Sequence, residues 1–286
     1  MEAIANLNGE QMPLAEAKVS ALDRGFLFGD AVYEVIRVYG GRAWLADQHF
    51  RRLARSLEAI RIGGIDLDRL RRRMDETIAA GPFREAIVYI QITRGSAPRS
   101  HPFPARAAPL EFLYVQEFRD PYAEARRDGA AVITMPDIRW GRCDVKSTNL
   151  LANVLAAQAA KEAGCVEALL VRPDGSVGEG THTSLFGVRG GMVLTAPNSN
   201  AILPGITRGL VLGLAKRAGV PEREQVLRLD ELGRVSELFL TGTTSEVLPV
   251  VRVDGRPVGD GRPGPVTRRM QEAYQEAVRE FVAGTS

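Results

Sequence analysis

Strand–turn–strand patterns recur through the second half of the chain and limit it to a largely antiparallel arrangement. The segments EALLVRPDGSVGEG (167–180) and SLFGVRGGMVLTAP (184–197) each place apolar residues on both sides of a short turn. The turns, at residues 173–175 and 190–191, are rich in Pro, Asp and Gly, which suit a reversal of the backbone. Because such short connections join antiparallel neighbours, we expect consecutive hairpins.

Other segments predict helices as well as further strands, so the expected fold class is α+β. Helices are expected where apolar residues recur at helical spacing, at about 47–63, 67–81, 149–163, 207–219 and 265–282. Asp47 is the expected N-cap of the first of these helices. Strands are expected in β-branched and aromatic runs at 31–46 (a hairpin turning at Gly40-Gly41), 86–95, 110–118, 130–135 and 237–255 (around a Gly/Thr loop).

A drop in hydrophobicity around RDPYAEARRDG (119–129) is the best candidate for a boundary between domains. At 286 residues and 45% hydrophobic content, the chain is long enough to form two domains with cores of their own. We therefore expect a small N-terminal domain at 1–118, a linker at 119–124 and a larger domain at 125–286.

The balance of charge and the scarcity of cysteine argue against several classes of function. The chain has 37 Lys plus Arg against 35 Asp plus Glu, without a long block of one sign, so no nucleic-acid partner is expected. Two cysteines and three histidines lack the spacing of a metal site, so no metal is expected. No apolar run approaches the ~20 residues of a membrane span, and the first twenty residues lack a signal or transit pattern. We expect a cytoplasmic protein without a membrane partner.

Lys146 is unusual in a chain that uses arginine for most of its cations. Only four of the 37 Lys plus Arg residues are lysine, which leaves 37 − 4 = 33 arginines. Lys161 and Lys216 precede helix-ending glycines, where a cation complements the helix dipole. Lys146 instead lies between an expected strand and an expected helix. A lysine, unlike an arginine, can lose its proton and form a Schiff base, which would imply pyridoxal phosphate. On this stretch alone, an ordinary surface lysine is the simpler interpretation.

Seven segments, in order along the chain, resemble the class IV pyridoxal-phosphate aminotransferases, and among them the D-amino acid aminotransferases. They are DRGFLFGDAVYEVIRVYGG, HFRRLARSLEAI, RGSAPRSHPFP, IRWGRCDVKSTNLLANVLAAQAA, GEGTHTSLFG, ILPGITRG and LFLTGTTSEVLPV. The resemblance covers nearly the whole chain. It implies a two-domain fold of type IV, with a small α/β N-terminal domain and a larger β-barrel-like domain flanked by helices. It also implies pyridoxal 5'-phosphate as the cofactor.

The resemblance assigns cofactor-binding roles to individual residues. Lys146 matches the lysine that forms the internal aldimine and moves the proton during catalysis. Glu179 matches the carboxylate that partners the pyridine nitrogen and strengthens the cofactor as an electron sink. The matches to phosphate ligands and to an apolar residue near the ring are Arg52, Ile206, Thr207, Thr243 and Leu203. Without the resemblance, these residues would be interpreted as a solvated helix face, a helix cap and polar turns.

The resemblance also assigns the substrate end of the site. Arg99 and His101 form an Arg-x-His pattern similar to the carboxylate-binding loop of the D-amino acid aminotransferases, and Tyr33 matches the tyrosine that joins it. An arginine fork binds a carboxylate through two hydrogen bonds, and histidine and tyrosine add donors. In the family this loop reaches the neighbouring subunit, which implies a homodimer with shared active sites.

The expected activity is transamination between D-amino acids and 2-oxo acids, as in D-alanine plus 2-oxoglutarate giving pyruvate plus D-glutamate. The alternatives are an (R)-selective amine transaminase, a branched-chain L-amino acid transaminase and, less favoured, an aminodeoxychorismate lyase. An inactive homologue that serves as a binding protein is a hypothesis of another class. Three positions depart from the family pattern and bear on substrate choice: His182, Ser184 and Gly141.

Overall fold

The computed structural model describes residues 2–284, which divide into two compact units. The first unit contains the chain up to Arg119 together with Val145–Asn149. The second unit contains Asp120–Asp144 and the chain from Leu150 onward. The division of the first 119 residues from most of the remainder resembles the expected domains, but the lysine-bearing segment, which the sequence analysis placed in the larger domain, packs with the first unit.

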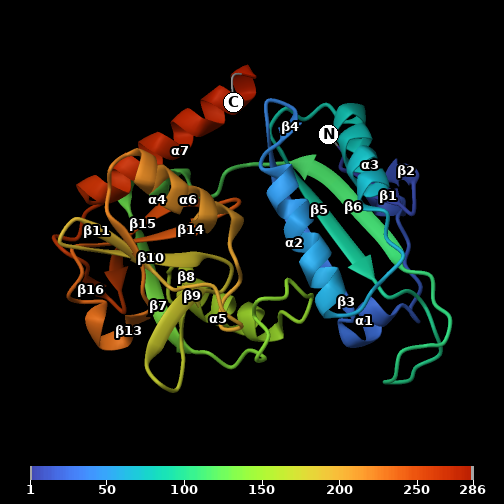
Figure 1. Cartoon of the computed structure of the whole chain (residues 1–286), viewed down its shortest axis with the longest axis horizontal. Coiled ribbons are helices and arrows are strands. Elements are labelled where there is room, and N and C mark those ends of the chain that lie inside the picture. The colour runs from blue at the N-terminus through green and yellow to red at the C-terminus, as the bar shows by residue number, and fades with distance from the viewer. Residues whose placement is uncertain (1, 285–286) are drawn as a thin grey trace. The chain divides into compact units, whose positions relative to one another are not determined.

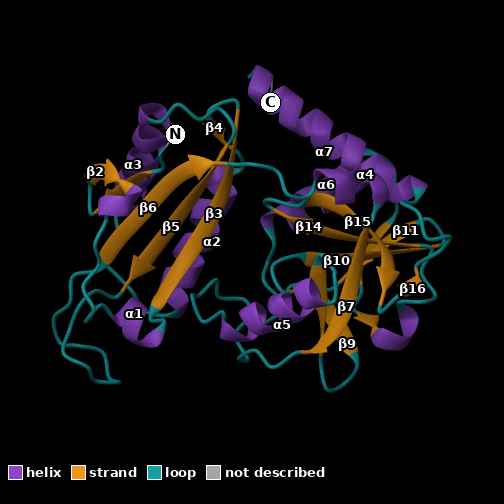
Figure 2. Ribbon diagram, turned by 180° about the vertical axis from the view of Figure 1, so that it is seen from behind, coloured by secondary structure: helices purple, strands orange, loops and turns teal. Residues whose placement is uncertain are grey.

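The first unit is a six-stranded antiparallel sheet covered by helices (Figure 1). Its strands, in the order β2-β1-β6-β5-β3-β4 across the sheet, are β1 (Ile4–Leu7), β2 (Glu10–Pro13), β3 (Ala31–Tyr39), β4 (Arg42–Ala43), β5 (Ala86–Thr93) and β6 (Leu110–Glu117). Its helices are a 3-10 helix (Leu14–Glu16), α1 (Arg24–Phe28), α2 (Ala46–Ala59) and α3 (Leu67–Ala80). In Figure 2, seen from behind, the sheet lies in front of α2.

Alternation along the strands sends one face of this sheet into the core beneath α2 and α3. Val32, Ile36 and Val38 of β3 and the matching residues of β5 are buried, whereas intervening positions such as Tyr33 are only partly buried. The helices contribute Leu53, Leu57, Leu70, Met74 and Ile78 to the same cluster. The apolar periodicity that predicted the two helices therefore marks their buried faces.

The prediction that Asp47 caps the helix at 47–63 is wrong. The structure places Leu45 at the N-cap, with a left-handed φ of 53° and no side-chain hydrogen bond. Asp47 lies inside the first turn, and its carboxylate accepts a hydrogen bond from Arg71 instead. A carboxylate there still complements the positive end of the helix dipole, which explains why its sequence signal resembles that of a cap.

The second unit contains a ten-stranded sheet that closes on itself. Its strands are β7 (Ala130–Pro136), β8 (Glu167–Val171), β9 (Ser176–Gly180), β10 (Ser184–Arg189), β11 (Met192–Thr195), β12 (Glu222–Glu224), β13 (Leu227–Arg228), β14 (Glu237–Gly242), β15 (Glu246–Val253) and β16 (Arg256–Pro257). Neighbours run in the order β10-β14-β15-β7-β8-β9, and β9 pairs again with β10 through Glu179 and Ser184. The expectation of an α+β fold with a barrel-like domain is confirmed.

Helices flank this barrel. They are α4 (Ala123–Asp128), α5 (Leu151–Glu162), α6 (Ile206–Arg217), a 3-10 helix (Leu229–Glu231) and α7 (Pro265–Ala283). In Figure 1, α4, α6 and α7 lie together beside β14 and β15, whereas α5 packs on β7 and β8. The two predicted hairpins are β8–β9 and β10–β11, and both are antiparallel as expected. Among residues 2–284, no helix combines the length and apolar character that a membrane crossing requires.

Candidate functional site

The segment Val145–Asn149 extends the sheet of the first unit at β3. The N–H of Tyr33 donates to the carbonyl of Lys146 (2.9 Å), and Ser147 forms an antiparallel bridge with Val32. On this side of the strand, β4 covers only the far end of β3, so the first residues of β3 have an open edge. The lysine-bearing segment fills that edge.

This pairing places the Lys146 side chain on the tyrosine-bearing face of the sheet. Its Nζ lies 4.1 Å from the centre of the Tyr33 ring, and its main-chain N–H donates to Ser56 Oγ (3.2 Å). We call Tyr33, Ser56 and Lys146 the lysine cluster. Tyr33 stacks on Tyr89, which stacks in turn on Tyr114. Burial, followed by the neighbouring phenols Tyr33 and Tyr114, raises the pKa of Tyr89, so its hydroxyl stays neutral at physiological pH.

Arg52 lies on the opposite, helix-covered face, in a buried ionic network. Its Nε and Nη2 donate to the two oxygens of Glu34 (2.7 Å each), and His49 Nδ1 lies 2.7 Å from Glu34 Oε2. Burial opposes ionisation of Glu34, but Arg52 and then His49 outweigh it and lower its pKa to about 2. Glu34 therefore fixes one edge of the Arg52 guanidinium.

Arg99 and His101 lie in the long loop between β5 and β6, where both side chains are exposed. The Phe28 ring at the end of α1 contacts both of them. The Arg99 guanidinium carbon lies 5.3 Å from the centre of that ring, and the His101 ring centre lies 5.5 Å from it. The structure thus brings the two expected carboxylate-binding side chains together around one aromatic ring.

In the second unit, Glu179 lies on β9 within a cluster that the chain builds from three segments. Its Oε1 accepts a hydrogen bond from Arg139 Nη1 (2.5 Å), and its Oε2 accepts one from the N–H of Leu203 (3.0 Å). Asp137 binds the other side of Arg139 through two further bonds. We call Asp137, Arg139, Glu179 and Leu203 the glutamate cluster. Leu203 therefore orients Glu179 through its main chain.

The environment of Glu179 moves its ionisation toward neutral pH. The side chain is buried, and burial raises its pKa to about 6 even though Arg139 and the Leu203 N–H favour the carboxylate. A carboxyl group with a pKa near 6 can gain or lose its proton at neutral pH, depending on the charge of the ligand that binds next to it. It suits a ligand that presents a protonated nitrogen.

The phosphate-binding candidates of the second unit lie at a helix start and a strand turn. Ile206 and Thr207 open α6 after Gly205, an N-cap residue without a side-chain bond to the helix. Thr243 lies in the turn between β14 and β15, and the buried hydroxyls of Thr241 and Ser245 have no hydrogen-bond partner among the described residues. Free N–H groups at a helix N-terminus and nearby hydroxyls are the donors that a phosphate dianion needs. With Glu179, these residues fit a phosphorylated pyridine.

Two of the three departures from the family pattern lie in or directly after the turn that follows β9. Ser184 is buried and pairs with Glu179 across β9 and β10. His182, in the turn between these strands, lies 3.0 Å from the buried carboxylate of Glu167 and 3.1 Å from the Tyr122 hydroxyl. Gly141 borders open space, since a Cβ there would meet no atom within 4 Å. The contacts of His182 were not predicted from the sequence.

The partners that hold the expected residues were also not predicted from the sequence. Arg139 and Asp137 lie in a segment quoted for its lysine, and their Asp-x-Arg spacing was the available signal of a local ion pair. Glu34 follows Tyr33 directly and is, with Arg37, one of two charged residues buried in β3. A carboxylate at such a position requires a buried partner, which could have pointed to Arg52.

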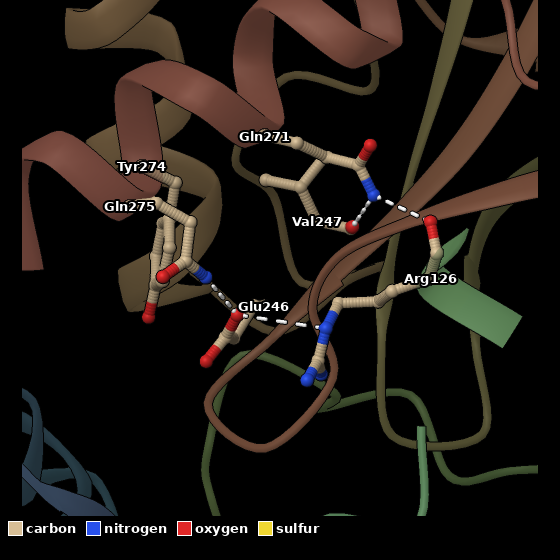
Figure 3. A pocket seen from close by; sticks show the side chains of 6 residues that line it. All are labelled: Arg126, Glu246, Val247, Gln271, Tyr274 and Gln275. Carbon is tan, nitrogen blue, oxygen red and sulfur yellow. Dashed lines mark hydrogen bonds and ion pairs between the residues drawn. The ribbon is translucent and has the colours of Figure 1, made fainter. Parts of the chain in front are cut away.

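Two cavities are found in the second unit. One, of about 180 Å³, lies between α7 and β15, where Gln275 and Arg126 surround the Glu246 carboxylate (Figure 3). The other, of about 420 Å³, borders Arg139 and Asp137. None of the predicted site residues lines either cavity.

Sequence relatives match the chain nearly from end to end. Residues 31–253 match the family model described as amino-transferase class IV. The chain is 40% identical to the D-alanine aminotransferase of Bacillus licheniformis over 282 residues, 97% of this chain and 98% of that protein. It is 38% identical to the D-alanine aminotransferase of Staphylococcus aureus strain MSSA476, with 95% and 96% covered.

Solved structures share the fold. The Escherichia coli branched-chain amino acid aminotransferase superposes with a TM-score of 0.90 at 29% identity, covering 96% of this chain and 94% of that one. The branched-chain aminotransferase of the archaeon Thermoproteus uzoniensis, solved with norvaline, gives 0.87 at 27% identity, covering 100% and 96%. The family model alone spans well over half of the sequence, and the fold agrees with it. The chain belongs to the class IV aminotransferases.

Proposed function

We propose that the protein transfers amino groups between D-amino acids and 2-oxo acids, with D-alanine and 2-oxoglutarate as a representative pair, using pyridoxal 5'-phosphate. The observation that carries the substrate assignment is the meeting of Arg99 and His101 around Phe28. A cation and an imidazole held side by side suit an α-carboxylate. The names of the B. licheniformis and S. aureus relatives support the same substrate class.

Pyridoxal phosphate, when bound, supplies a conjugated electron sink that stabilises negative charge at the α-carbon of the amino acid. We propose that the Nζ of Lys146 would hold the cofactor covalently, and that, once the amino group of the substrate displaces it there, the freed amine would take the α-proton of the substrate. The main chain of Lys146 is hydrogen-bonded to β3 and to Ser56, so the side chain that bears the amine extends from a fixed backbone position. Only the neutral amine can accept a proton.

Glu179 and the phosphate ligands hold the two ends of the cofactor in this proposal. The Glu179 carboxylate, oriented by Arg139 and the Leu203 N–H, pairs with the ring nitrogen and keeps it protonated. The N–H groups of Ile206 and Thr207, the Thr243 turn and Arg52 bind the phosphate. Leu203 adds an apolar contact to the ring.

We also propose a cytoplasmic homodimer with shared active sites. In a single chain, Arg99 and His101 are exposed. In the dimer, the Arg99–His101 loop of one subunit would bind the substrate of the other. Tyr33 would contribute its hydroxyl to the same carboxylate.

Branched-chain L-amino acid transamination is the second candidate. It is favoured by the solved structures with TM-scores of 0.90 and 0.87, both named branched-chain aminotransferases. Open space at Gly141 is compatible with bulkier substrates. The two candidates differ in the chirality of the amino acid substrate, which a single experiment can determine.

The test is a half-reaction of the pyridoxal phosphate-loaded protein with D-alanine, L-leucine and (R)-1-phenylethylamine in separate cuvettes. We expect D-alanine to convert the visible absorbance band of the bound cofactor to the near-ultraviolet band of pyridoxamine phosphate. Conversion by L-leucine but not D-alanine would establish the second candidate instead. Lys146→Ala, loaded in the same way, is the control for conversion without the enzyme's amine.

A further inference from the structure

We propose that Arg24 is a positioning residue for the loop that carries Arg99 and His101. Through this loop it sets the affinity of the enzyme for the carboxylate of its substrate. The inference rests on the proposed function, because it deepens the role given there to the Arg-x-His pair. The assignment comes from the contacts of Arg24 with the loop's main chain.

Arg24 is the first residue of α1 and is buried, with 3% of its surface exposed. Its guanidinium donates to three successive carbonyls of the loop. Nη1 donates to Ser100 O (2.5 Å) and more weakly to Pro102 O (3.5 Å), while Nη2 donates to His101 O (3.1 Å). One side chain thus fixes the main chain on both sides of His101 and immediately after Arg99.

The loop needs such donors because its own main chain offers few. Residues 98–109 include four prolines, which lack an N–H and cannot form strand ladders. A guanidinium, with five N–H donors in a rigid fork, can bind several carbonyls at once. Lysine, with one compact ammonium on a flexible stem, cannot reproduce that geometry.

Asp30 neutralises Arg24 and connects it to a second buried arginine. Its Oδ2 accepts hydrogen bonds from Arg24 Nε (2.8 Å) and Arg94 Nε (2.7 Å), and its Oδ1 accepts one from Arg94 Nη2 (2.9 Å). Burial opposes ionisation of Asp30, but Arg94 and Arg24 together lower its pKa. Arg94 also donates to the carbonyls of Ile60 and Arg61, which anchors the cluster at the end of α2.

Two phenylalanine rings connect the Arg24–Asp30–Arg94 cluster with the side chains of the loop. The Arg94 guanidinium lies 3.6 Å from the centre of the Phe103 ring. The Phe28 ring, which contacts Arg99 and His101, also lies 4.8 Å from the Arg24 guanidinium carbon. Arg24 therefore holds the loop through its carbonyls and shares an aromatic contact with both substrate-binding side chains.

The experiment compares D-alanine with D-alaninol, which has a hydroxymethyl group in place of the carboxylate, as amino donors in steady-state turnover of the loaded enzyme with 2-oxoglutarate. Arg24→Met removes the carbonyl contacts, so we expect the KM for D-alanine to rise about tenfold to a hundredfold with little change in kcat. The KM for D-alaninol should change by less than about twofold. Arg24→Lys keeps the charge beside Asp30, and it should fold and show a smaller rise.

Arg37→Met is the matched control. Arg37 is a buried arginine of the same unit that donates to the carbonyls of Val38 and Ala86 and to Glu85, away from the loop. It should lower thermal stability but leave the ratio of the two KM values unchanged. Amide hydrogen exchange gives a readout without substrate: residues 99–103 should exchange faster in Arg24→Lys and not in Arg37→Met.

Arg99→Ala separates the failure of this inference from the failure of the proposed function. If Arg99→Ala raises the KM for D-alanine selectively and neither Arg24 variant does, the positioning role is wrong while the proposed site stands. If both Arg24 variants affect D-alanine and D-alaninol equally, Arg24 only stabilises the fold and the inference is wrong. If Arg99→Ala has no selective effect, the carboxylate-binding role fails, and the inference fails with it.

Discussion

Lys146 is held in place through its main chain, whereas its side chain extends toward the Tyr33 ring. Its N–H and carbonyl are bonded to Ser56 Oγ and the Tyr33 N–H, and its Nζ approaches the Tyr33 ring. Replacing the side chain therefore removes the amine and leaves these two main-chain hydrogen bonds in place. The proposed role of the amine can therefore be tested without removing the hydrogen bonds that hold the segment.

We predict that Lys146→Ala folds normally and loses turnover. Loss of the amine should lower kcat with D-alanine by roughly 10²–10⁴-fold or more, because the proposed transfer of the α-proton depends on it. The melting temperature of the cofactor-free protein should stay within a few degrees of the wild-type value. A Lys146→Ala protein that turns over at the wild-type rate would exclude Lys146 as the catalytic amine.

The raised pKa of Glu179 leads to a prediction of how cofactor binding depends on pH. Because burial raises its pKa to about 6, the carboxylate predominates above pH 6 and the neutral acid below it. A protonated ring nitrogen pairs only with the carboxylate, so the dissociation constant of pyridoxal phosphate should rise about tenfold between pH 7 and pH 5. A fluorescence titration of the cofactor-free protein measures this change.

Glu179→Gln is the control for that titration. The amide keeps the shape of the side chain but does not ionise near pH 6, so its binding curve should lack the acid limb assigned to Glu179. If the wild type and Glu179→Gln lose affinity in parallel, another group is responsible. The phosphate group, which also titrates near pH 6, would be the first to consider.

At the scale of elements, α2 and β3 are joined by charge as well as by apolar packing. Glu34 of β3 accepts from Arg52 and His49 of α2, and this polar contact lies beside an apolar core. Breaking a buried ion pair leaves an uncompensated charge, which is more costly than replacing the whole pair. The network should therefore hold α2 in one register on the sheet.

We predict that Glu34→Gln destabilises the first unit. The pKa of Glu34 is lowered from 4.5 to about 2, which corresponds to about 3 kcal/mol of stability at neutral pH. This contribution is present above pH 4.5 and is lost as the pH falls through 2. Urea unfolding at pH 7 and pH 3 should show a smaller difference between wild type and variant at the lower pH. A constant difference would assign the loss to packing.

The start of α6 gives a second prediction at this scale. A Cβ added at Gly205 would lie 2.6 Å from Ser184 Oγ. Gly205→Ala must therefore displace either the start of α6 or the Ser184 side chain. We expect Gly205→Ala to weaken pyridoxal phosphate binding by about tenfold, because the N–H groups of Ile206 and Thr207 move with the helix start. Gly205→Ala combined with Ser184→Ala should recover most of the affinity. No recovery would show that the clash is not the cause.

Elements were easier to predict than the contacts between them. The apolar spacing of Leu53, Leu57 and Leu70 follows from local periodicity, and the structure places these residues in one core. The boundary at Leu45 depends on a left-handed residue that no local signal marks. Arg139 and Glu179 meet across 40 residues of chain, and a pairing of that range is set by the fold rather than by neighbouring sequence.

At the scale of the whole molecule, a mixing experiment tests the proposed dimer with shared sites. Lys146→Ala and Arg99→Ala homodimers should each be weakly active. If the loop of one subunit serves its partner, a mixed dimer regains one native site, and random exchange of equal amounts restores about a quarter of the wild-type sites. Arg99 acting within its own subunit would give no gain on mixing. Native mass spectrometry, which resolves the small mass difference between the two variant subunits, should confirm that mixed dimers have formed.

The site residues themselves came from a resemblance rather than from their local pattern. Arg52 alone suggests a solvated helix face, yet it is buried and paired. Arg99 and His101 alone suggest an exposed loop, which they occupy. Burial, partners and distances become visible only when the chain is folded, whereas seven ordered segments were enough to name the family.

The placement of Val145–Asn149 has a consequence for recombination between relatives. Lys146 is encoded within the stretch of sequence that builds the barrel, but it folds as an edge of the other unit's sheet. A chimaera joined at residue 120 would therefore pair the Lys146 segment of one parent with the β3 strand of the other. Exchanges that keep residues 145–149 together with the first 119 residues preserve the native pairing of the Lys146 segment with β3. Such exchanges require two additional crossovers.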